Sequence, residues 1–187
     1  HPEILLTLAH ITRNEIKEAK ISLELLQRRQ SNNPVIKYLA GRLAEAEGNY
    51  NEALNYYNQF LPSATPEYAN ETTARIEIMR LLSRPKISDQ DEEHLVQYEI
   101  QAGMIRSALQ RAKHLSEIAG DSLDNKIWYS MILRDAGLLY DSANMLEAVL
   151  KESPDRPDIW YLLGDIYLQI RLTSQAEHAL NNALQLD

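Results

Sequence analysis

Residues 157–187 read PDIWYLLGDIYLQIRLTSQAEHALNNALQLD. Apolar side chains recur about one helical turn apart from Trp160 to Tyr167, and again from Ala176 to Leu184. The two runs are separated by a short polar interruption, and Pro157 stands where the first turn of a helix tolerates proline. This stretch therefore predicts two amphipathic helices that form a hairpin.

The hairpin pattern recurs along the chain with a period of about 34 residues, a spacing that we call one repeat. Two series of residues show this period, and both are interrupted once, at the same place in the chain. One series has small side chains, and its members are Ala19, Ala53, Ala108, Ser142 and Ala176. The other series is glycine, and its members are Gly48, Gly103 and Gly137. Small residues let two helices approach closely, so we expect these positions to lie at helix contacts.

We divide the chain into five helical hairpins with one insert. The hairpins are residues 1–33, 34–67, 89–122, 123–156 and 157–187, and the insert is residues 68–88. A hairpin of this size has too little core to be stable alone, so neighbouring hairpins must stack. No window alternates convincingly between apolar and polar residues, as a half-buried strand would. The sequence therefore predicts an all-α solenoid.

The insert has an amphipathic pattern of its own. Its apolar face predicts an extra helix over about residues 67–83, which ends before Pro85. Ser88 followed by Asp91 resembles the signal that caps the start of the next helix. Two interpretations remain open: two sub-modules, 1–84 and 89–187, joined by a hinge at residues 85–87, or one continuous superhelix that contains an odd helix.

Composition narrows the possible functions. Cysteine is absent, and the formal net charge is −8, so an acidic surface repels nucleic acid and anionic lipid. The apolar run at residues 4–11 is too short to span a bilayer, and no basic segment precedes it. His114 and Glu117 share a helix face, but no second pair completes a metal site, and no nucleophile lies among the carboxylates. We expect no cofactor, metal ion or catalytic residue, while the compartment, cytoplasmic or periplasmic, stays open.

The last hairpin resembles the tetratricopeptide repeat (TPR) family. The residues that match the family pattern W-x2-L-G-x2-Y and the later small and large positions are Trp160, Leu163, Gly164, Tyr167, Ala176, Leu180 and Ala183. Residues 34–67 also match well, with Gly41, Gly48, Tyr50, Ala53, Tyr57 and Phe60. The other three hairpins match loosely; in one of them, Lys126 replaces the expected aromatic residue. The resemblance implies a right-handed superhelix of about five TPR hairpins plus one extra helix.

The resemblance also implies a concave groove, lined by the first helix of each hairpin. Residues of those helices that lie outside the predicted core positions are the candidates for contact with a peptide or protein partner. They are Tyr38, Arg42, Glu45, Gln97, Gln101, Ile127, Met131, Arg134, Tyr161, Asp165 and Gln169, and the insert adds Thr72, Ile76 and Arg80. Some family members bind a chaperone's terminal carboxylate with Lys and Asn side chains on this wall, a set that this sequence lacks.

We expect a non-enzymatic scaffold for protein–protein interaction. Two alternatives remain: an assembly arm of a larger membrane-export, polysaccharide-secretion or pilus-assembly protein, and a self-associating scaffold. The last hairpin is not followed by a polar capping helix. This predicts either a fragment of a longer array or ends that pair with another chain as a homo-oligomer.

Overall fold

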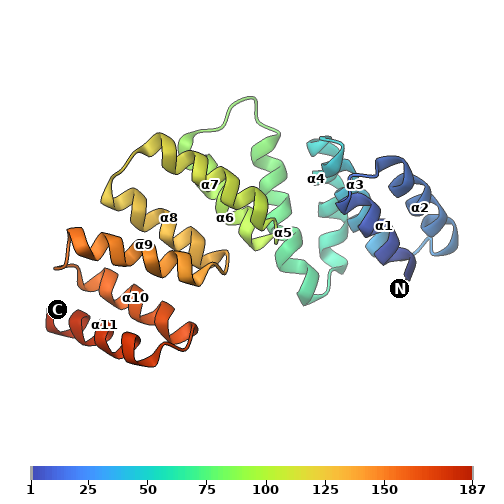
Figure 1. The fold of residues 1–187 in the computed structure, drawn as a ribbon. Helices are drawn as coiled ribbons and strands as arrows, with labels where there is room; N and C mark the ends of the chain where they lie inside the picture. Colours follow the sequence, from blue (N-terminus) through green and yellow to red (C-terminus); the bar gives the residue numbers. More distant parts are fainter. Residues whose placement is uncertain (1, 187) are drawn as a thin grey trace. The chain divides into compact units, whose positions relative to one another are not determined.

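The computed structural model describes residues 2–186, in which every regular element is a helix (Figure 1). The α-helices are α1 (Pro2–Thr12), α2 (Ile16–Arg29), α3 (Val35–Ala46), α4 (Tyr50–Phe60), α5 (Pro66–Leu82), α6 (Asp89–Gln101), α7 (Ile105–Ala119), α8 (Leu123–Asp135), α9 (Leu139–Glu152), α10 (Pro157–Gln169) and α11 (Thr173–Leu186). A short 3-10 helix, η1 (Leu61–Ser63), follows α4. The predicted all-α class is confirmed. The chain forms two compact units, residues 1–104 (unit 1) and 105–187 (unit 2).

Unit 1 contains α1 to α6, and each of these helices packs against the next one along the chain. Helix α1 also packs against α3. Helix α5 confirms the extra helix expected at about 67–83, and it contacts both α4 and α6. An aromatic group lies in the core between α3, α4 and α5, where Tyr38 packs against Phe60 and Tyr68 with ring centroids 5.4 Å apart in each pair.

The link between α5 and α6 is held at both of its ends. Ser88 accepts a hydrogen bond from the backbone of Asp91, and the Asp91 carboxylate accepts one from the backbone of Ser88, so the predicted capping box is present. The Asp91 carboxylate also pairs with Arg84 at 3.0 Å, across the proline turn. The two units divide between Met104 and Ile105, later than the boundary that we placed at residues 85–87. A hinge at residues 85–87 stays a prediction.

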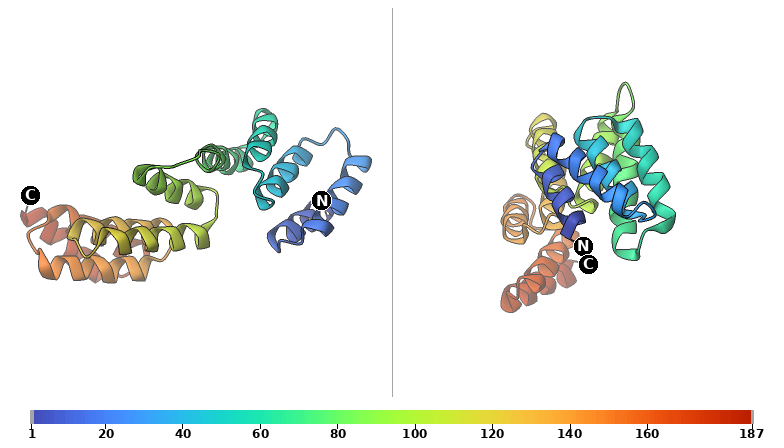
Figure 2. Two further views of the ribbon diagram at one scale, coloured as in Figure 1. Left: turned by 90° about the horizontal axis from the view of Figure 1, so that it is seen from above. Right: turned by 90° about the vertical axis from the view of Figure 1, so that its right-hand side faces the viewer.

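Unit 2 contains α7 to α11, and α8 to α11 lie side by side in Figures 1 and 2. Its core is built where α9, α10 and α11 meet. Leu146 and Val149 of α9 are fully buried there, together with Ile166 of α10 and Ala176 of α11. The predicted hairpins 123–156 and 157–187 correspond to α8–α9 and α10–α11.

The columns of small residues have the expected environment. Every member of the series Ala19, Ala53, Ala108, Ser142 and Ala176 has an exposed fraction of 0%. The close approach extends to two glycines on the facing helices. A β-carbon added at Gly41 would lie 2.7 Å from the Tyr57 ring, and one added at Gly164 would lie 2.7 Å from Leu180. The repeat therefore fixes where paired helices come closest.

The turn inside the hairpins also recurs with the repeat. Its residue with positive φ is Asn14, Gly48, Gly103, Gly137 or Arg171, at φ angles of 59°, 76°, 71°, 81° and 62°. Glycine adopts this conformation without cost, whereas a residue with a β-carbon does so under strain. The sequence columns showed glycine at three of these positions, but all five share one backbone conformation.

Candidate interaction surfaces

Three side chains of unit 1 that we expected on the inner wall of the groove belong instead to a network of charged and phenolic groups. The Tyr38 hydroxyl donates to the Glu71 carboxylate at 2.7 Å, and Arg42 donates to the Tyr38 hydroxyl oxygen at 2.9 Å. The Glu45 carboxylate accepts a hydrogen bond from the Tyr57 hydroxyl at 2.5 Å. These contacts join α3, α4 and α5.

Arg75 of α5 is the centre of this network, and only 3% of it is exposed. Its Nη1 donates to both carboxylate oxygens of Glu45 at 2.7 and 2.8 Å, and its Nε donates to Glu71 at 2.8 Å. Its Nη2 donates to the carbonyl of Ala102, just after α6, at 3.4 Å. One guanidinium thus connects α3, α5 and the end of α6, with its donors directed at several acceptors.

The electrostatics of the network favour the charged forms of Glu71 and Arg75. Burial alone would lower the pKa of Arg75, but Glu45, and then Glu71, raise it above its ordinary value. Burial alone would raise the pKa of Glu71, but hydrogen bonds from Tyr38 and Arg75 hold it below 4.5. Burial, followed by the neighbouring Glu45 carboxylate, raises the pKa of Tyr57 well above 10.0, so this phenol stays protonated.

The predicted contact residues of unit 1 therefore differ in accessibility. Tyr38 is 2% exposed, Ile76 is 3% exposed and Thr72 is fully buried, so these three side chains cannot contact a partner in this structure. Those with some or full exposure are Arg42, Glu45 and Gln97, which are half-buried, and Arg80 and Gln101, which are exposed. Sequence reasoning failed here because it treated polar residues on a helix as solvated, whereas Arg75 and its partners satisfy one another inside the core.

The predicted contact residues of unit 2 are more accessible. Tyr161 of α10 is 65% exposed and Met131 of α8 is 39% exposed. The remaining ones are Gln169, which is exposed, and Ile127, Arg134 and Asp165, which are half-buried. Leu168 was not predicted, yet it is 52% exposed about one helical turn beyond Asp165. It stands one repeat after Arg134, so the repeat spacing itself could have identified it.

Tyr161 also borders a hollow of about 580 Å³ between α10 and α11. The other residues that line it are Pro157, Asp158, Leu180, Ala183 and Leu184. Leu184 is 76% exposed. The counterparts of Leu180, Ala183 and Leu184 one repeat earlier are Leu146, Val149 and Leu150, which are buried in the core shared with α10.

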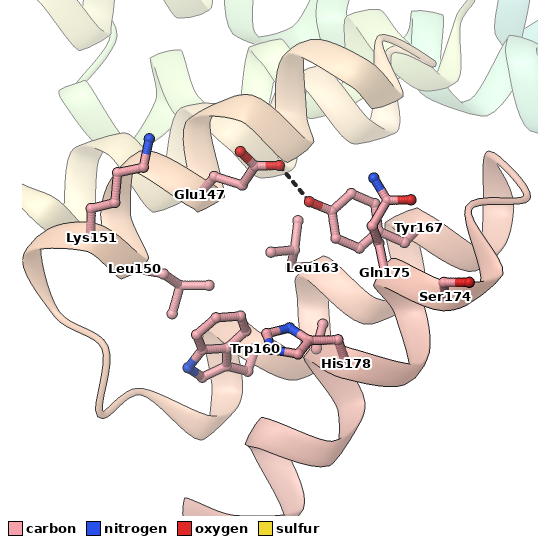
Figure 3. Close-up of a pocket in the computed structure, with 10 residues that line it drawn as sticks. Glu147, Leu150, Lys151, Trp160, Leu163, Tyr167, Ser174, Gln175 and His178 are labelled. Atoms are coloured by element: carbon pink, nitrogen blue, oxygen red, sulfur yellow. Dashed lines mark hydrogen bonds between the residues drawn. The ribbon is translucent and has the colours of Figure 1, made fainter.

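A second pocket in unit 2, of about 390 Å³, lies over α10 between α9 and α11 (Figure 3). Its floor is Leu163, and Trp160 and His178 form one wall with ring centroids 6.0 Å apart and an edge-on geometry. The Trp160 indole N–H donates to the carbonyl of Pro154 at 2.8 Å, which fixes the ring. The remaining lining residues are Glu147, Leu150, Lys151, Tyr167, Ser174, Gln175 and Ala179.

The polar rim of this pocket is asymmetric. The Tyr167 hydroxyl donates to the Glu147 carboxylate (Figure 3). Burial, and then this hydrogen bond, raise the pKa of Tyr167 far above 10.0. Lys151, one turn after Glu147, is exposed and forms no hydrogen bond or ion pair with residues 2–186. The rim therefore offers a solvated cation beside an occupied carboxylate.

An equivalent pocket, of about 540 Å³, lies one repeat earlier in unit 2. Six of its lining residues are the one-repeat counterparts of residues in the first pocket, and they are Lys113, Ser116, Glu117, Lys126, Tyr129 and Met145. Its charged groups are paired: Lys113 lies 4.0 Å from Glu117, and Lys126 pairs with Glu152 at 2.8 Å and Asp121 at 3.2 Å.

Two further properties bear on the function. Over the described residues 2–186, no group of three or more His, Asp or Glu side chains is arranged to hold a metal ion. Within the same range, no helix has the length and hydrophobicity needed to cross a membrane.

Comparison with known proteins identifies the repeat. Two family models, each described as "Tetratricopeptide repeat", match residues 133–187 and 35–61. No curated protein matches the chain in sequence. A TPR protein from Parabacteroides merdae is similar in structure with a TM-score of 0.51 and 16% identity, over 100% of this chain and 79% of that one. At this identity the likeness shows the fold alone.

Two other solved structures are less similar. YrrB, described as "a TPR protein with an unusual peptide-binding site", aligns with a TM-score of 0.45 and 17% identity, over 100% of this chain and 85% of YrrB. MamA from Desulfovibrio magneticus aligns with a TM-score of 0.44 and 14% identity, over 98% of this chain and 92% of MamA.

Proposed function

We propose that this chain, in which tetratricopeptide repeat models match residues 35–61 and 133–187, is a non-enzymatic scaffold that binds a peptide or protein along α8 and α10 of unit 2. The resemblance to this family, carried by the repeats at residues 35–61 and 133–187, implies a protein-interaction scaffold. The proposal is confined to unit 2 because, among the inner-wall candidates of unit 1, Tyr38, Arg42 and Glu45 belong to the Arg75 network and Thr72 and Ile76 are buried.

One observation carries this proposal: α8 and α10 expose large apolar side chains at repeat positions that fall on one face of the helix. Tyr161 and Leu168 are seven residues apart, so they lie on one face of α10, and both are more than half exposed. Met131 of α8 stands one repeat before Asp165, which lies between them in sequence. An exposed apolar cluster rimmed by polar side chains is typical of a surface that a partner covers.

A site-specific crosslinking experiment tests the proposal. A photoreactive amino acid is placed at position 131 or 168 and, as a control, at exposed Glu177 of α11, and each protein is irradiated in the cells that make it. We expect the same partner to be crosslinked from positions 131 and 168 but not from position 177. When the photoreactive amino acid is at position 131, the additional substitution Leu168→Asp should reduce the amount of crosslinked partner at least fivefold. Equal yields from position 177, or no effect of Leu168→Asp, would contradict the proposal.

A second candidate function, self-association, is favoured by the hollow between α10 and α11. Leu180, Ala183 and Leu184 line it, and their counterparts one repeat earlier are buried in contact with α10. A helix from another copy can cover the hollow in the same way. Leu5 and Leu6 of α1, which are 65% and 53% exposed, supply accessible apolar side chains for this contact. An assembly-arm function has no such observation and stays a prediction.

The test of self-association is the mass in solution over a hundredfold range of concentration. The proposed contact predicts a mass that rises with concentration in the wild type and stays at the monomer value in Leu184→Glu. The control, Ile118→Glu, changes another exposed apolar residue of unit 2, which is 71% exposed on α7, and should behave as the wild type. A wild-type chain that stays monomeric throughout would exclude this candidate.

A further inference from the structure

The pocket over α10 is a binding site of a different kind from the exposed face of α8 and α10. We propose that it accepts one aromatic side chain of a peptide partner, and that an acidic residue beside this aromatic one pairs with Lys151. The proposal goes beyond the scaffold function proposed above, because it places a second contact on α9 and α11. The two can fail separately, because different residues form the two surfaces.

The shape of the pocket suits one side chain. Its volume of about 390 Å³ lies near the lower end of the range for small-molecule sites, about 300–1,000 Å³. The buried residues at its base, Leu150, Leu163 and Ala179, are apolar. The wall formed by Trp160 and His178 presents ring edges and faces, against which another aromatic ring can pack edge-on or offset. An aromatic anchor is also the side chain most often used at the centre of protein interfaces.

The walls of the pocket are held in place before any partner arrives. Trp160 is tied to Pro154 through its indole N–H, and Tyr167 is tied to Glu147 across the gap between α10 and α9. Figure 3 shows Glu147 and Lys151 on one side, His178 and Gln175 on the other, and Leu163 between them. Binding to such a site costs little ordering of side chains, because most of the contacting groups are already fixed.

The charge of the rim decides which residue accompanies the aromatic one. The Glu147 carboxylate already accepts the Tyr167 hydroxyl, whereas Lys151 has no partner among residues 2–186. A carboxylate of the peptide can therefore pair with Lys151 without displacing an existing contact. Ser174 and Gln175, exposed on the opposite side, can hydrogen-bond to the peptide backbone.

The equivalent pocket one repeat earlier supports this specificity by contrast. There Lys126 stands in place of Trp160, Ser116 in place of Leu150, and Met145 in place of Ala179. The order of the charged pair is reversed, with Lys113 and Glu117 in place of Glu147 and Lys151. Its cations are already paired, so the earlier pocket lacks both the aromatic wall and the available charge.

The earlier pocket also supplies the substitutions that test the proposal. Ala179→Met fills the apolar base with the residue that stands at the equivalent position of the earlier pocket, Met145. Lys151→Glu reverses the available charge at an exposed position, so it does not depend on core packing. The matched control is Glu117→Lys, which makes the corresponding change in the earlier pocket.

The probe is a displayed library of random dodecapeptides. Peptides that bind the wild-type chain are selected, and those that also bind the Ala179→Met variant are removed. We expect the recovered peptides to share an aromatic residue with Asp or Glu within three positions. Fluorescence anisotropy of labelled peptides should show binding at least tenfold weaker in Ala179→Met and in Lys151→Glu. Binding should stay within twofold of the wild type in Glu117→Lys.

The proposal is overturned if no peptide is enriched above background, if the enriched peptides lack the aromatic and acidic pair, or if Lys151→Glu binds as tightly as the wild type. If peptide binding is lost in Leu168→Asp but kept in Lys151→Glu, the exposed face of α8 and α10 is the binding surface. The proposed function then stands and the pocket does not. Self-association that Ala179→Met abolishes would assign the pocket to a second copy of the chain and would also overturn it.

Discussion

Helix α5 of unit 1 and helix α11 of unit 2 are packed by opposite means. Helix α11 presents Ala176, Ala179 and Ala183, and it lies so close to α10 that Gly164 has no room for a β-carbon. Helix α5, which lies outside the repeat, presents Arg75 to two carboxylates instead. The contact between α10 and α11, which recurs with the repeat, depends on small side chains. The contact made by the inserted helix α5 depends on the buried charge of Arg75.

This difference shows how a repeat protein can accommodate an irregular element. Small side chains allow close contact wherever the repeat brings two helices together, so the same solution serves several hairpins. An inserted helix has no counterpart to copy, and the hydrogen bonds of Arg75 have fixed directions that suit one docking geometry. A buried ion pair is costly to form, and it is more costly still to break on one side, because a lone buried charge remains.

Removing Arg75 should have the largest effect on stability. Arg75→Ala leaves Glu45 and Glu71 without their main cationic partner inside unit 1 and should cost about 3–5 kcal/mol. Urea unfolding followed by circular dichroism measures the loss. The control is Arg80→Ala on the same helix, whose exposed pair with Glu77 should be worth about 0.5 kcal/mol or less. If Arg75→Ala and Arg80→Ala lose similar amounts of unfolding free energy, burial of the ion pair does not determine how strongly α5 is held.

Enlarging a residue of the alanine column should have the next largest effect. Ala176→Leu and Ala53→Leu each force extra volume between paired helices and should cost about 1–3 kcal/mol. Glu177→Leu, at the exposed neighbour of Ala176, adds an apolar side chain without crowding and should change stability by about 0.5 kcal/mol or less. If Ala176→Leu unfolds at the same urea concentration as the wild type, the packing register of unit 2 is wrong.

The sequence predicted the parts of the fold that repeat. The spacing of Ala53, Ala108 and Ala176 located the helix contacts, and Ser88 with Asp91 located the start of α6. The same reasoning placed the insert helix to within a residue or so at each end, because an apolar face and a proline delimit it. These features depend on residues near one another in sequence or at a fixed spacing.

The candidate site was predicted less well, because side-chain pairing across distant residues leaves no periodic signal. Tyr38 and Glu71 are 33 residues apart, and Arg75 and Glu45 are 30 apart, but no single spacing marks a pair as buried. Tyr38, Thr72 and Ile76, which we expected on the inner wall of unit 1, are thus buried, while the positions expected in unit 2 stayed accessible. Lys151 and its pocket were not predicted, since a lone lysine in the last turn of a helix is usually solvated.

The stability of unit 1 should depend on pH through Glu71, with a smaller effect than either change above. Its pKa is lowered on folding, so its contribution is present above the unfolded value, near 4.5, and is lost as the pH falls through the lower folded value. Glu71→Gln should therefore cost about 1 kcal/mol at pH 7 and less at pH 3. The control is Glu93→Gln at an exposed position of α6. Thermal melts at the two pH values measure the difference, and a cost that does not change with pH would contradict this role.

The smallest predicted effect is a gain in stability at the turn between α10 and α11. Arg171 has a φ of 62° where Gly137 has 81° one repeat earlier, so Arg171→Gly relieves backbone strain at the expense of a more flexible unfolded chain. The net gain should be about 0.5 kcal/mol. Asn14→Gly, at the same turn of unit 1, should gain less, because asparagine tolerates positive φ better than arginine does.

The reverse substitution makes the comparison between turns complete. Gly137→Arg places the residue of the α10–α11 turn into the α8–α9 turn and should cost about 1 kcal/mol, since its added β-carbon meets open space and backbone strain alone opposes it. Urea unfolding of the three variants on one background ranks them. If Arg171→Gly destabilises the chain, the arginine side chain contributes more than the strain costs. The turns would then differ between repeats in energy although they share a backbone conformation.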